Sequence, residues 1–389
     1  MYESVPPRLY GGTERVVSYL TEELVKQGHD VTLFASGDSA TTARLIPCSR
    51  QSLRLDENCV DQLAHHILML EKVFRMVDEF DVVHFHVDYL HFPLSRRHNI
   101  AHVTTLHGRL DLPDLQPLYR EFSRMPVVSI SNSQRRPLPW INWQGTVYHG
   151  LPADLHTPGD GSGGYLAFVG RISPEKRVDR AIEIARRTGL KLIIAAKVDR
   201  VDREYFEQII QPLLKRAPVE YVGEVNEQEK GALLRQAYAL VFPIDWPEPF
   251  GLAMIEAMAC GTPVIAFRCG SVPEVVDEGI TGYICDNLDD AVRAVELVAS
   301  MDRTQVRRQF ERRFTAGRMA RDYTAIYERL IEQRVHVPPA IGVAPGRYIA
   351  GPTPTPTPTP TPAHGGANRA IQHVEDGYNT YAGYTSNPA

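Results

Sequence analysis

The sequence predicts an α/β protein with two doubly wound domains, each a parallel sheet with helices on both faces. Apolar runs typical of buried strands alternate with segments of helical periodicity over most of the chain. Residues 151–164 then hold proline and glycine without periodicity, and the alternation begins again after them. These two observations place an interdomain linker at 151–164 between two domains of similar construction.

The first domain is expected over residues 1–150. Apolar residues at helical spacing predict a helix over 13–28, followed by a buried strand at 30–36 and a second helix over 59–79. Further strands are expected at 81–87, 102–107, 127–131 and 146–149.

The second domain is expected over residues 165–302. Its strands are predicted at 165–170, 190–196, 219–223, 237–243 and 263–267, and its helices at 178–188, 201–216, 227–237 and 250–259. Residues 303–333 predict one or two arginine-rich helices, on which interleaved acidic residues indicate a solvated face. Residues 334–389 contain the repeat PTPTPTPTPTP and are expected to be disordered, with the repeat in an extended polyproline II form.

Composition excludes several classes of protein. A net charge of -5 and a pI near 6.3 argue against a general nucleic-acid binder. The 5 cysteines form no CxxC pair and are expected to be reduced, which favours a cytoplasmic location. Neither a signal segment nor a membrane-spanning apolar run is visible, so any membrane contact is expected to be peripheral.

Two carboxylates stand out in the stretch PIDWPEPFGLAMIEAMACGTPVIAF. Glu248 lies on a proline-rich loop, and Glu256 lies in the predicted helix, roughly 10 to 12 Å further along. That is about the span of a sugar and a ribose joined by two phosphates. Between the carboxylates, the first N–H groups of the helix, at Phe250, Gly251 and Leu252, are suited to a diphosphate. Because the helix is otherwise apolar, Glu256 is expected either to have an internal partner or to hold ligand hydroxyls.

Three separated motifs give the chain a family resemblance. LYGGTER, GRISPEK and EPFGLAMIEAMACGTPVIA occur in this order, and the chain resembles family 4 of the retaining glycosyltransferases over about residues 3 to 333. The resemblance implies the GT-B fold, with two Rossmann-like domains facing across a cleft and final helices over 303–333 that cross back to the first domain. It also implies a nucleotide-diphosphate-sugar donor, retention of anomeric configuration, and neither a metal nor another cofactor.

The start of the chain departs from this pattern. A doubly wound domain begins with a strand that leads into its first glycine-rich turn, but residues 1–10 contain no apolar run. We therefore expect the first strand of the domain to be missing from this sequence. The resemblance implies a strand just upstream of Tyr2, so we expect either a start site assigned too late or a truncated product.

Residue roles follow from position and resemblance together. Arg171 and Lys176 follow a strand at its carboxyl end, and both are expected to bind the diphosphate. By resemblance, Glu248 contacts the hydroxyls of the donor sugar, and Gly12 approaches the donor from the first domain. His107 ends a strand before Gly108, and the resemblance gives it a catalytic, sugar-contacting role. The remaining residues expected at the donor are Phe250, Gly251, Leu252 and Glu256.

The acceptor side is less well defined. His84, His86 and His91 suggest a metal site, but no cysteine or carboxylate spacing completes one and the sequence contains no Asp-x-Asp pair. We therefore expect no metal, and we place His86 and Asp88 on the acceptor side. Glu14 and Asp111 are weaker candidates for the site.

The predicted activity is transfer of a sugar to a glycan, lipid-linked or small-molecule acceptor. A sugar-nucleotide epimerase, a glycan phosphorylase, and an inactive remnant without its first strand remain as alternatives. A nicotinamide dehydrogenase is disfavoured because the glycines of GDGSGGYLAFVG precede the strand instead of following it.

Overall fold

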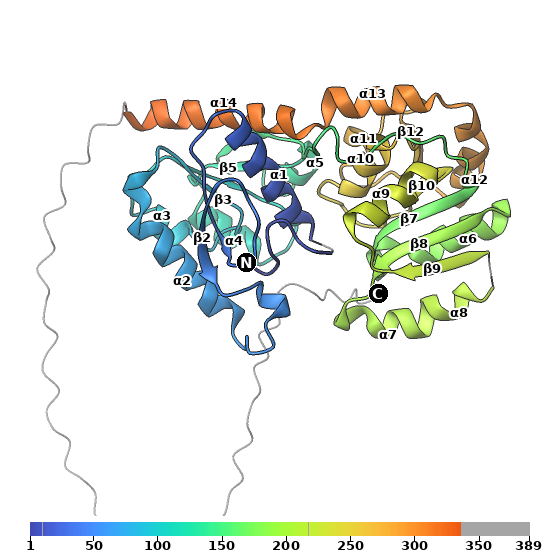
Figure 1. Ribbon diagram of the computed structural model, residues 1–389, viewed down its shortest axis with the longest axis horizontal. Helices are drawn as coiled ribbons and strands as arrows, with labels where there is room; N and C mark the ends of the chain where they lie inside the picture. Colours follow the sequence, from blue (N-terminus) through green and yellow to red (C-terminus); the bar gives the residue numbers. More distant parts are fainter. Residues whose placement is uncertain (10, 217, 336–389) are drawn as a thin grey trace, which may run out of the picture. The chain divides into compact units, whose positions relative to one another are not determined.

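The computed structural model describes residues 1–9, 11–216 and 218–335 (Figure 1). Within these ranges the strands form three sheets, and every strand pairing is parallel. The predicted α/β class is therefore confirmed. The expected disorder of 336–389 lies outside the described residues.

The strands of the first domain form two separate sheets. One pairs β1 (Thr32–Ser36) with β2 (Arg44–Ser49), and the other has the order β3-β4-β5-β6. The strands of the second sheet are β3 (Val83–Phe85), β4 (His102–Thr105), β5 (Val127–Ser129) and β6 (Trp143–Thr146). The helices are α1 (Gly12–Lys26), α2 (Gln62–Arg75), α3 (Phe92–Ser95), α4 (Leu115–Glu121) and α5 (Asn132–Arg135).

The strands β1, β3, β4 and β5 are shorter than predicted, and β2 and β6 differ from the sequence prediction more strongly. β2 was not predicted, because none of its residues is buried and its proline and terminal polar residues hide the strand pattern. β6 begins three residues earlier than the predicted strand at 146–149. Ladder pairing reaches Val147, whose N–H donates to the carbonyl of Ser129 at 2.9 Å. Tyr148 and His149 lie beyond the strand.

The second domain has one six-stranded sheet of order β12-β11-β10-β7-β8-β9. Its strands are β7 (Tyr165–Arg171), β8 (Lys191–Lys197), β9 (Val219–Gly223), β10 (Ala239–Phe242), β11 (Val264–Phe267) and β12 (Gly282–Cys285). Its helices are α6 (Val178–Thr188), α7 (Arg203–Tyr205), α8 (Gln211–Leu214), α9 (Glu227–Gln236), α10 (Leu252–Ala259), α11 (Val272–Val275) and α12 (Leu288–Leu297). A π-helical turn at Phe206–Ile210 joins α7 to α8, so one predicted helix is three short pieces.

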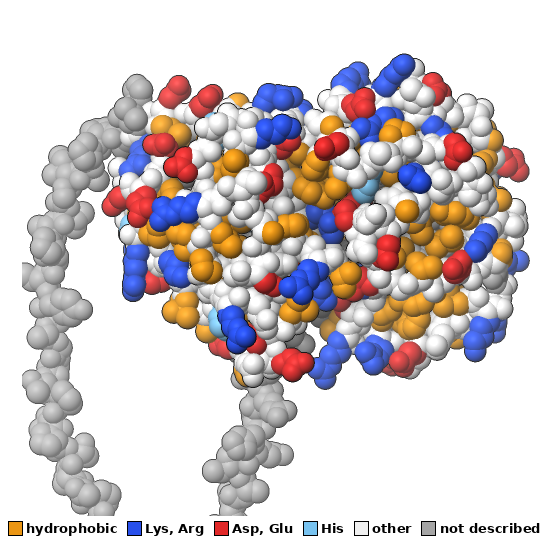
Figure 2. Space-filling view, in the orientation of Figure 1, with side chains coloured by type: hydrophobic (Ala, Val, Ile, Leu, Met, Phe, Trp, Pro, Cys, Tyr) orange, Lys and Arg blue, Asp and Glu red, His pale blue; other side chains and the backbone are white. Residues whose placement is uncertain are grey.

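The arginine-rich segment forms α13 (Arg303–Arg313) and α14 (Ala316–Val335). Figure 1 shows α14 lying along the first domain. The hydroxyl of Tyr323 lies 2.8 Å from Oγ1 of Thr105, and that of Tyr327 lies 2.7 Å from Nδ1 of His84. Acidic and basic side chains both appear along the outer surface of these two helices (Figure 2). The helix runs two residues into the segment 334–389, which the sequence analysis expected to be disordered.

The predicted linker 151–164 is tied to the second domain. Gly159 N–H donates to the carbonyl of Cys260 at 3.0 Å, and Arg303 Nε donates to the carbonyl of Gly159 at 2.9 Å. A β-carbon at Gly159 would lie 2.1 Å from the carbonyl oxygen of Arg235, so only glycine fits there. The chain crosses between domains at Leu151 and again at 314–316, and these two crossings hydrogen-bond to each other. In the described part of the chain, no helix combines the length and apolar composition that crossing a membrane requires.

Candidate active site

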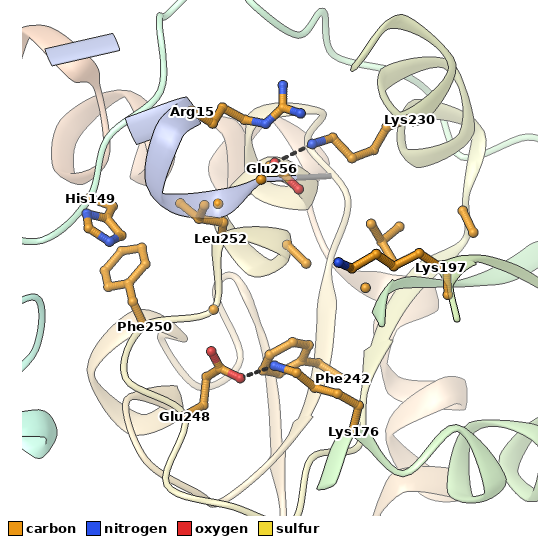
Figure 3. Close-up of a pocket in the computed structure, with 18 of the residues that line it drawn as sticks. Arg15, His149, Lys176, Lys197, Lys230, Phe242, Glu248, Phe250, Leu252 and Glu256 are labelled. Carbon is orange, nitrogen blue, oxygen red and sulfur yellow. Dashed lines mark hydrogen bonds and ion pairs between the residues drawn. The ribbon is translucent and has the colours of Figure 1, made fainter. Parts of the chain in front are cut away.

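A cavity of about 360 Å³ lies where the first turn of α1 faces the carboxyl ends of the second-domain strands. Residues of both domains line it (Figure 3). Four lining side chains are cationic, namely Arg15, Lys176, Lys197 and Lys230, and three are acidic, namely Glu224, Glu248 and Glu256. Carboxyl strand ends are the edge at which open α/β sheets bind ligands, so the cavity lies where the fold favours a site.

Lys176 and Glu248 form an ion pair at one end of the cavity (Figure 3). Lys176 Nζ also lies over the rings of Trp246, 4.9 Å from its centroid, and Phe242, at 5.8 Å. Glu248 accepts a second hydrogen bond from Trp246 Nε1, at 2.9 Å. Both ionic side chains are largely buried, with 14% and 11% of their side-chain surface exposed. The pair is thus held on three sides by protein and open toward the cavity.

The loop that carries Glu248 is fixed through its backbone. Glu248 N–H donates to the carbonyl of Trp246 at 2.7 Å, and its own carbonyl accepts from Ser271 N–H at 3.0 Å. Gly270, at φ 54, lies so close to this loop that a β-carbon would come within 2.3 Å of the Glu248 carbonyl oxygen. The position of the carboxylate therefore depends on the turn at 270–271 as well as on its own loop.

A second set of charges occupies the opposite end of the cavity (Figure 3). Lys230 Nζ lies 2.5 Å from Glu256 and 3.2 Å from Glu227, which also pairs with Arg15 of the first domain. Burial acts to raise the pKa of Glu227, but the contact with His156 and the charges of Lys230 and Arg15 outweigh it and hold the pKa near about 2. Of the two possibilities left open for Glu256, the structure shows an internal partner, Lys230.

The start of α10 faces the cavity between these two groups of charges. The helix begins at Leu252, two residues later than predicted, because Gly251 adopts a left-handed conformation at φ 83. Glycine is favoured there by this conformation, because the close contact that a β-carbon would make, 2.8 Å to Met254 Cε, involves a flexible side chain that can move. Leu252 and Ala253 line the cavity, and N–H groups in the first turn of a helix have no intrahelical acceptor. A β-carbon at Gly12 would lie 3.5 Å from Leu252 Cδ1, which shows how closely α1 approaches α10.

A chain of buried imidazoles leads away from the cavity into the first domain. His107 and His149 line the cavity with ring centroids 5.4 Å apart, and His107 Nε2 lies 2.9 Å from His86 Nδ1. Burial lowers the pKa of His107 to about 4. Burial, together with the neighbouring imidazoles, also lowers the pKa of His86. Both rings are therefore neutral near pH 7, and one donates the shared hydrogen bond while the other accepts it.

The structure places most of the predicted site residues together, with some exceptions. Gly12, His107, Lys176, Glu248, Phe250, Gly251, Leu252 and Glu256 all line the cavity. Arg171 does not. It contacts Glu175 and lies 3.6 Å from Asp199 and 3.5 Å from Asp202, so it faces a different group of acids.

The residues expected on the acceptor side also lie elsewhere. His86 reaches the site only through its contact with His107 and lines a separate groove in the first domain, as does Glu14. Asp88, at φ 48, lines neither cavity. Asp111 forms a bidentate pair with Arg109, with both bonds at 2.6 Å. Among the described residues, no group of three or more histidine, cysteine or acidic side chains could hold a metal ion.

Sequence reasoning missed several side chains of the cavity, among them Lys197, His149, Arg15 and Lys230. Lys197 ends a strand in the same way as Arg171, so the strand-end argument applies to it equally. His149 precedes a glycine after a strand, as His107 does. Arg15 ends the motif LYGGTER in the first turn of α1, and Lys230 lies on a short helix with no local pattern that marks it. Lys197 also pairs with Asp199, at 2.9 Å.

Models of two known protein families match this chain. Residues 10–140 match the model described as "Glycosyltransferase Family 4", and residues 159–314 match "Glycosyl transferases group 1". The chain belongs to the family 4 glycosyltransferases. An uncharacterized glycosyltransferase of Methanocaldococcus jannaschii is 24% identical over 71% of this chain and 82% of its own length. A D-inositol 3-phosphate glycosyltransferase of Mycobacterium bovis is 30% identical, but only over 36% of this chain and 32% of that protein.

Solved structures show that the glycosyltransferase has the GT-B fold. AviGT4, a glycosyltransferase of avilamycin A biosynthesis, superposes with a TM-score of 0.65 at 23% identity, over 85% of this chain and 93% of its own. HepE of Anabaena, in complex with UDP and glucose, gives a TM-score of 0.65 at 16% identity, over 82% and 96%. The cavity described above lies between the two Rossmann-like domains of this glycosyltransferase.

Proposed function

We propose that this glycosyltransferase moves a hexosyl group, with retention, from a nucleotide-diphosphate-sugar to an acceptor hydroxyl without a metal ion. One observation carries the proposal. The cavity has Lys197 and the first turn of α10 in its centre and a carboxylate at either end, Glu248 paired with Lys176 and Glu256 paired with Lys230. Positive charge in the centre suits a diphosphate, and carboxylates at the ends suit the hydroxyls of two sugar rings.

The donor class has support from the fold neighbours. HepE of Anabaena was solved with UDP and with UDP-glucose. Its likeness to this chain is a likeness of fold, at 14% and 15% identity. We therefore propose a nucleoside diphosphate sugar as the donor class and commit to neither the base nor the sugar.

Each group has a proposed role in the transfer. Lys176 and Lys197 balance the charge that the diphosphate gains as its bond to the anomeric carbon breaks, and the N–H groups of Leu252 and Ala253 add to this stabilisation. Glu248 binds hydroxyls of the donor sugar, and Glu256, oriented by Lys230, binds the ribose. These roles need no divalent cation, because the side chains supply the positive charge.

Retention is proposed to proceed by attack on the front face of the donor. The bond between the anomeric carbon and phosphate oxygen breaks, the acceptor oxygen bonds to the same face of the carbon, and the departing phosphate takes the acceptor proton. Glu248 already forms an ion pair with Lys176 and accepts a hydrogen bond from Trp246. These interactions disfavour its carboxylate as a nucleophile. Neutral His107, which lines the cavity, is proposed to contact the transferred sugar. The acceptor is a glycan, a lipid-linked or a small molecule, and a cytoplasmic location fits the five free cysteines.

The test measures nucleotide release from a panel of donors, with and without acceptors. Lys176→Met and Glu248→Gln are expected to lower turnover by at least about 100-fold, the scale of losing one preorganised charge partner. Lys191→Met, on the same domain but exposed and paired with Glu220, is the matched control and should keep full activity.

Further measurements separate this proposal from the alternative functions. Full activity of the Lys176 and Glu248 variants would refute the assignment of the site. Release of nucleotide only with acceptor excludes an epimerase, and a requirement for free phosphate would indicate a phosphorylase instead. Loss of activity with a chelator, restored by a divalent metal, would refute metal independence. The anomeric configuration of the product, read by NMR, tests retention.

A further inference from the structure

His149 carries a buried imidazole on the first-domain side of the active-site cavity. It lies three residues beyond the end of β6 and lines the cavity with only 4% of its surface exposed. Figure 3 shows it beside Phe250, on the side of the cavity away from Lys197. Because Lys197 is proposed to bind the diphosphate, His149 lies away from the proposed diphosphate position.

The backbone of His149 is held by α14 and by the crossing between the domains. Arg318 Nη2 donates to the carbonyl of Tyr148 at 2.6 Å and to that of His149 at 3.0 Å. The next residue is Gly150, where a β-carbon would lie 2.3 Å from the carbonyl oxygen of Thr315. The chain is therefore closely packed on both sides of His149, and its ring starts from a fixed position.

Aromatic neighbours hold the ring of His149 in place. The ring of His107 is nearly parallel to it, with centroids 5.4 Å apart and planes at 20°. Phe250 packs against it at a centroid distance of 4.9 Å and an angle of 65°. These contacts fix the ring by packing and leave the hydrogen-bonding needs of its nitrogens unmet.

The ring nitrogens of His149 have no partner in the described part of the chain. Nδ1 is enclosed by protein and makes no hydrogen bond. Nothing among the described residues bonds Nε2 either, so Nε2 is the nitrogen left to face the cavity that the residue lines. By contrast, the buried His91 has both nitrogens 2.6 Å from hydroxyl oxygens, those of Ser95 and Thr104. The first domain thus satisfies a buried imidazole that lies away from the cavity.

The position of the ring proton follows from this arrangement. Burial, together with His107 and Arg318, lowers the pKa of His149, so its ring is neutral near pH 7. A neutral imidazole has one N–H donor and one bare nitrogen. A buried N–H without an acceptor is costly, so the proton belongs on Nε2 and the enclosed Nδ1 is bare. A neutral donor suits a hydroxyl oxygen, whereas a diphosphate is better matched by cations.

We propose that His149 is a substrate-contacting residue whose Nε2–H donates a hydrogen bond to a hydroxyl oxygen where the sugar passes from donor to acceptor. This inference rests on the proposed function. The hydroxyl belongs to the transferred sugar or to the acceptor, because both must meet at this point for the new glycosidic bond to form. His149 acts there beside His107, from the same domain.

The first experiment measures transfer by the parent, His149→Leu and His149→Gln. The donor is the one that the parent turns over fastest in a panel of UDP-, GDP- and ADP-hexoses. Leucine fills the space without a donor, whereas the amide of glutamine returns an N–H. We expect kcat/KM to fall about 10-fold in His149→Leu, the scale of one hydrogen bond, and to recover in large part in His149→Gln.

His102→Leu is the matched control for this experiment. His102 is also buried and also has an unpartnered nitrogen, but it does not line the cavity. Its variant should keep the kcat/KM of the parent. Full kcat/KM in His149→Leu, or an equal loss in His102→Leu, would overturn the proposal.

Two further measurements locate the hydroxyl. Donor hydrolysis without acceptor should fall in His149→Leu if the hydroxyl belongs to the transferred sugar. If it belongs to the acceptor, hydrolysis should stay the same while the KM for the acceptor rises, and either result supports the proposal. The affinity for UDP, GDP or ADP alone should not change. Weaker binding of the nucleoside diphosphate would place His149 at the diphosphate and overturn the proposal.

Urea unfolding without ligand tests the unpartnered nitrogens and needs no active enzyme. His149→Leu should unfold at the same urea concentration as the parent or a higher one, because no hydrogen bond is lost. His91→Leu should unfold at a lower concentration, because two hydroxyls lose their partner. An equally lowered midpoint for His149→Leu would show that the protein itself bonds the ring, and would overturn the proposal. A parent that transfers no sugar from the panel would instead count against the proposed function.

Discussion

Mild acid is expected to destabilise this protein through its buried histidines. Burial lowers the pKa of His107 to about 4, and burial together with the charge of His107 lowers that of His84 to about 3. In the unfolded chain both titrate near about 6.5. Below that pH the unfolded state binds more protons than the folded state, so stability is present above about 6.5 and falls as the pH falls. Between pH 7 and 5.5 the loss is about 1.2 kcal/mol for each histidine, or about 2.5 kcal/mol for the two.

The assay is urea unfolding at several pH values between 7 and 5.5. His84→Gln keeps groups able to hydrogen-bond Thr105 and Tyr327 but removes the titration, so the pH-dependent loss should shrink by about 1.2 kcal/mol. His29→Gln, at an exposed position, is the matched control and should leave the slope unchanged. A parent protein whose stability is flat or rises from pH 7 to 5.5 would refute the reasoning. An unchanged slope in His84→Gln would refute the role of that residue.

Three further predictions concern the cavity. Lys176→Met should lower the free energy of unfolding by about 2 kcal/mol, because the buried charge of Glu248 then has no cation beside it. Adding Glu248→Gln should restore most of this loss. A double-mutant cycle in urea in which the two effects simply add would contradict the prediction. Gly251→Ala should lower the free energy of unfolding by about 2 kcal/mol, because a residue with a β-carbon is strained at φ 83. Thermal unfolding equal to that of the parent would contradict the strain. In Gly12→Ala the new β-carbon would lie at an ordinary 3.5 Å from Leu252 Cδ1, so the melting temperature should stay the same while the KM for the donor rises. A melting temperature several degrees lower would show that the fold needs this glycine.

Periodicity and apolar runs were sufficient to predict much of the second domain. The helix at 178–188 and the strand at 219–223 have the predicted bounds. The alternation is clear there because β10 and β11 are buried along their whole length and α6 ends at Gly189. The first domain was harder, because β2 is half exposed and β3 and β5 have only three residues each. Short and exposed strands lack the pattern that burial imposes.

The sequence by itself was sufficient to predict several of the residues that line the cavity. Glu248, Glu256, Lys176 and the glycine before α10 stand in sequence motifs whose local structure, a strand end or a helix start, can be predicted. Only the tertiary structure decided which cations face it. Arg171 is the register partner of Lys197, yet its contacts are with acids outside the cavity, which it does not line. Lys197 and Lys230 reach the cavity from elements distant in sequence. Such pairings depend on how the elements pack, which local pattern does not encode.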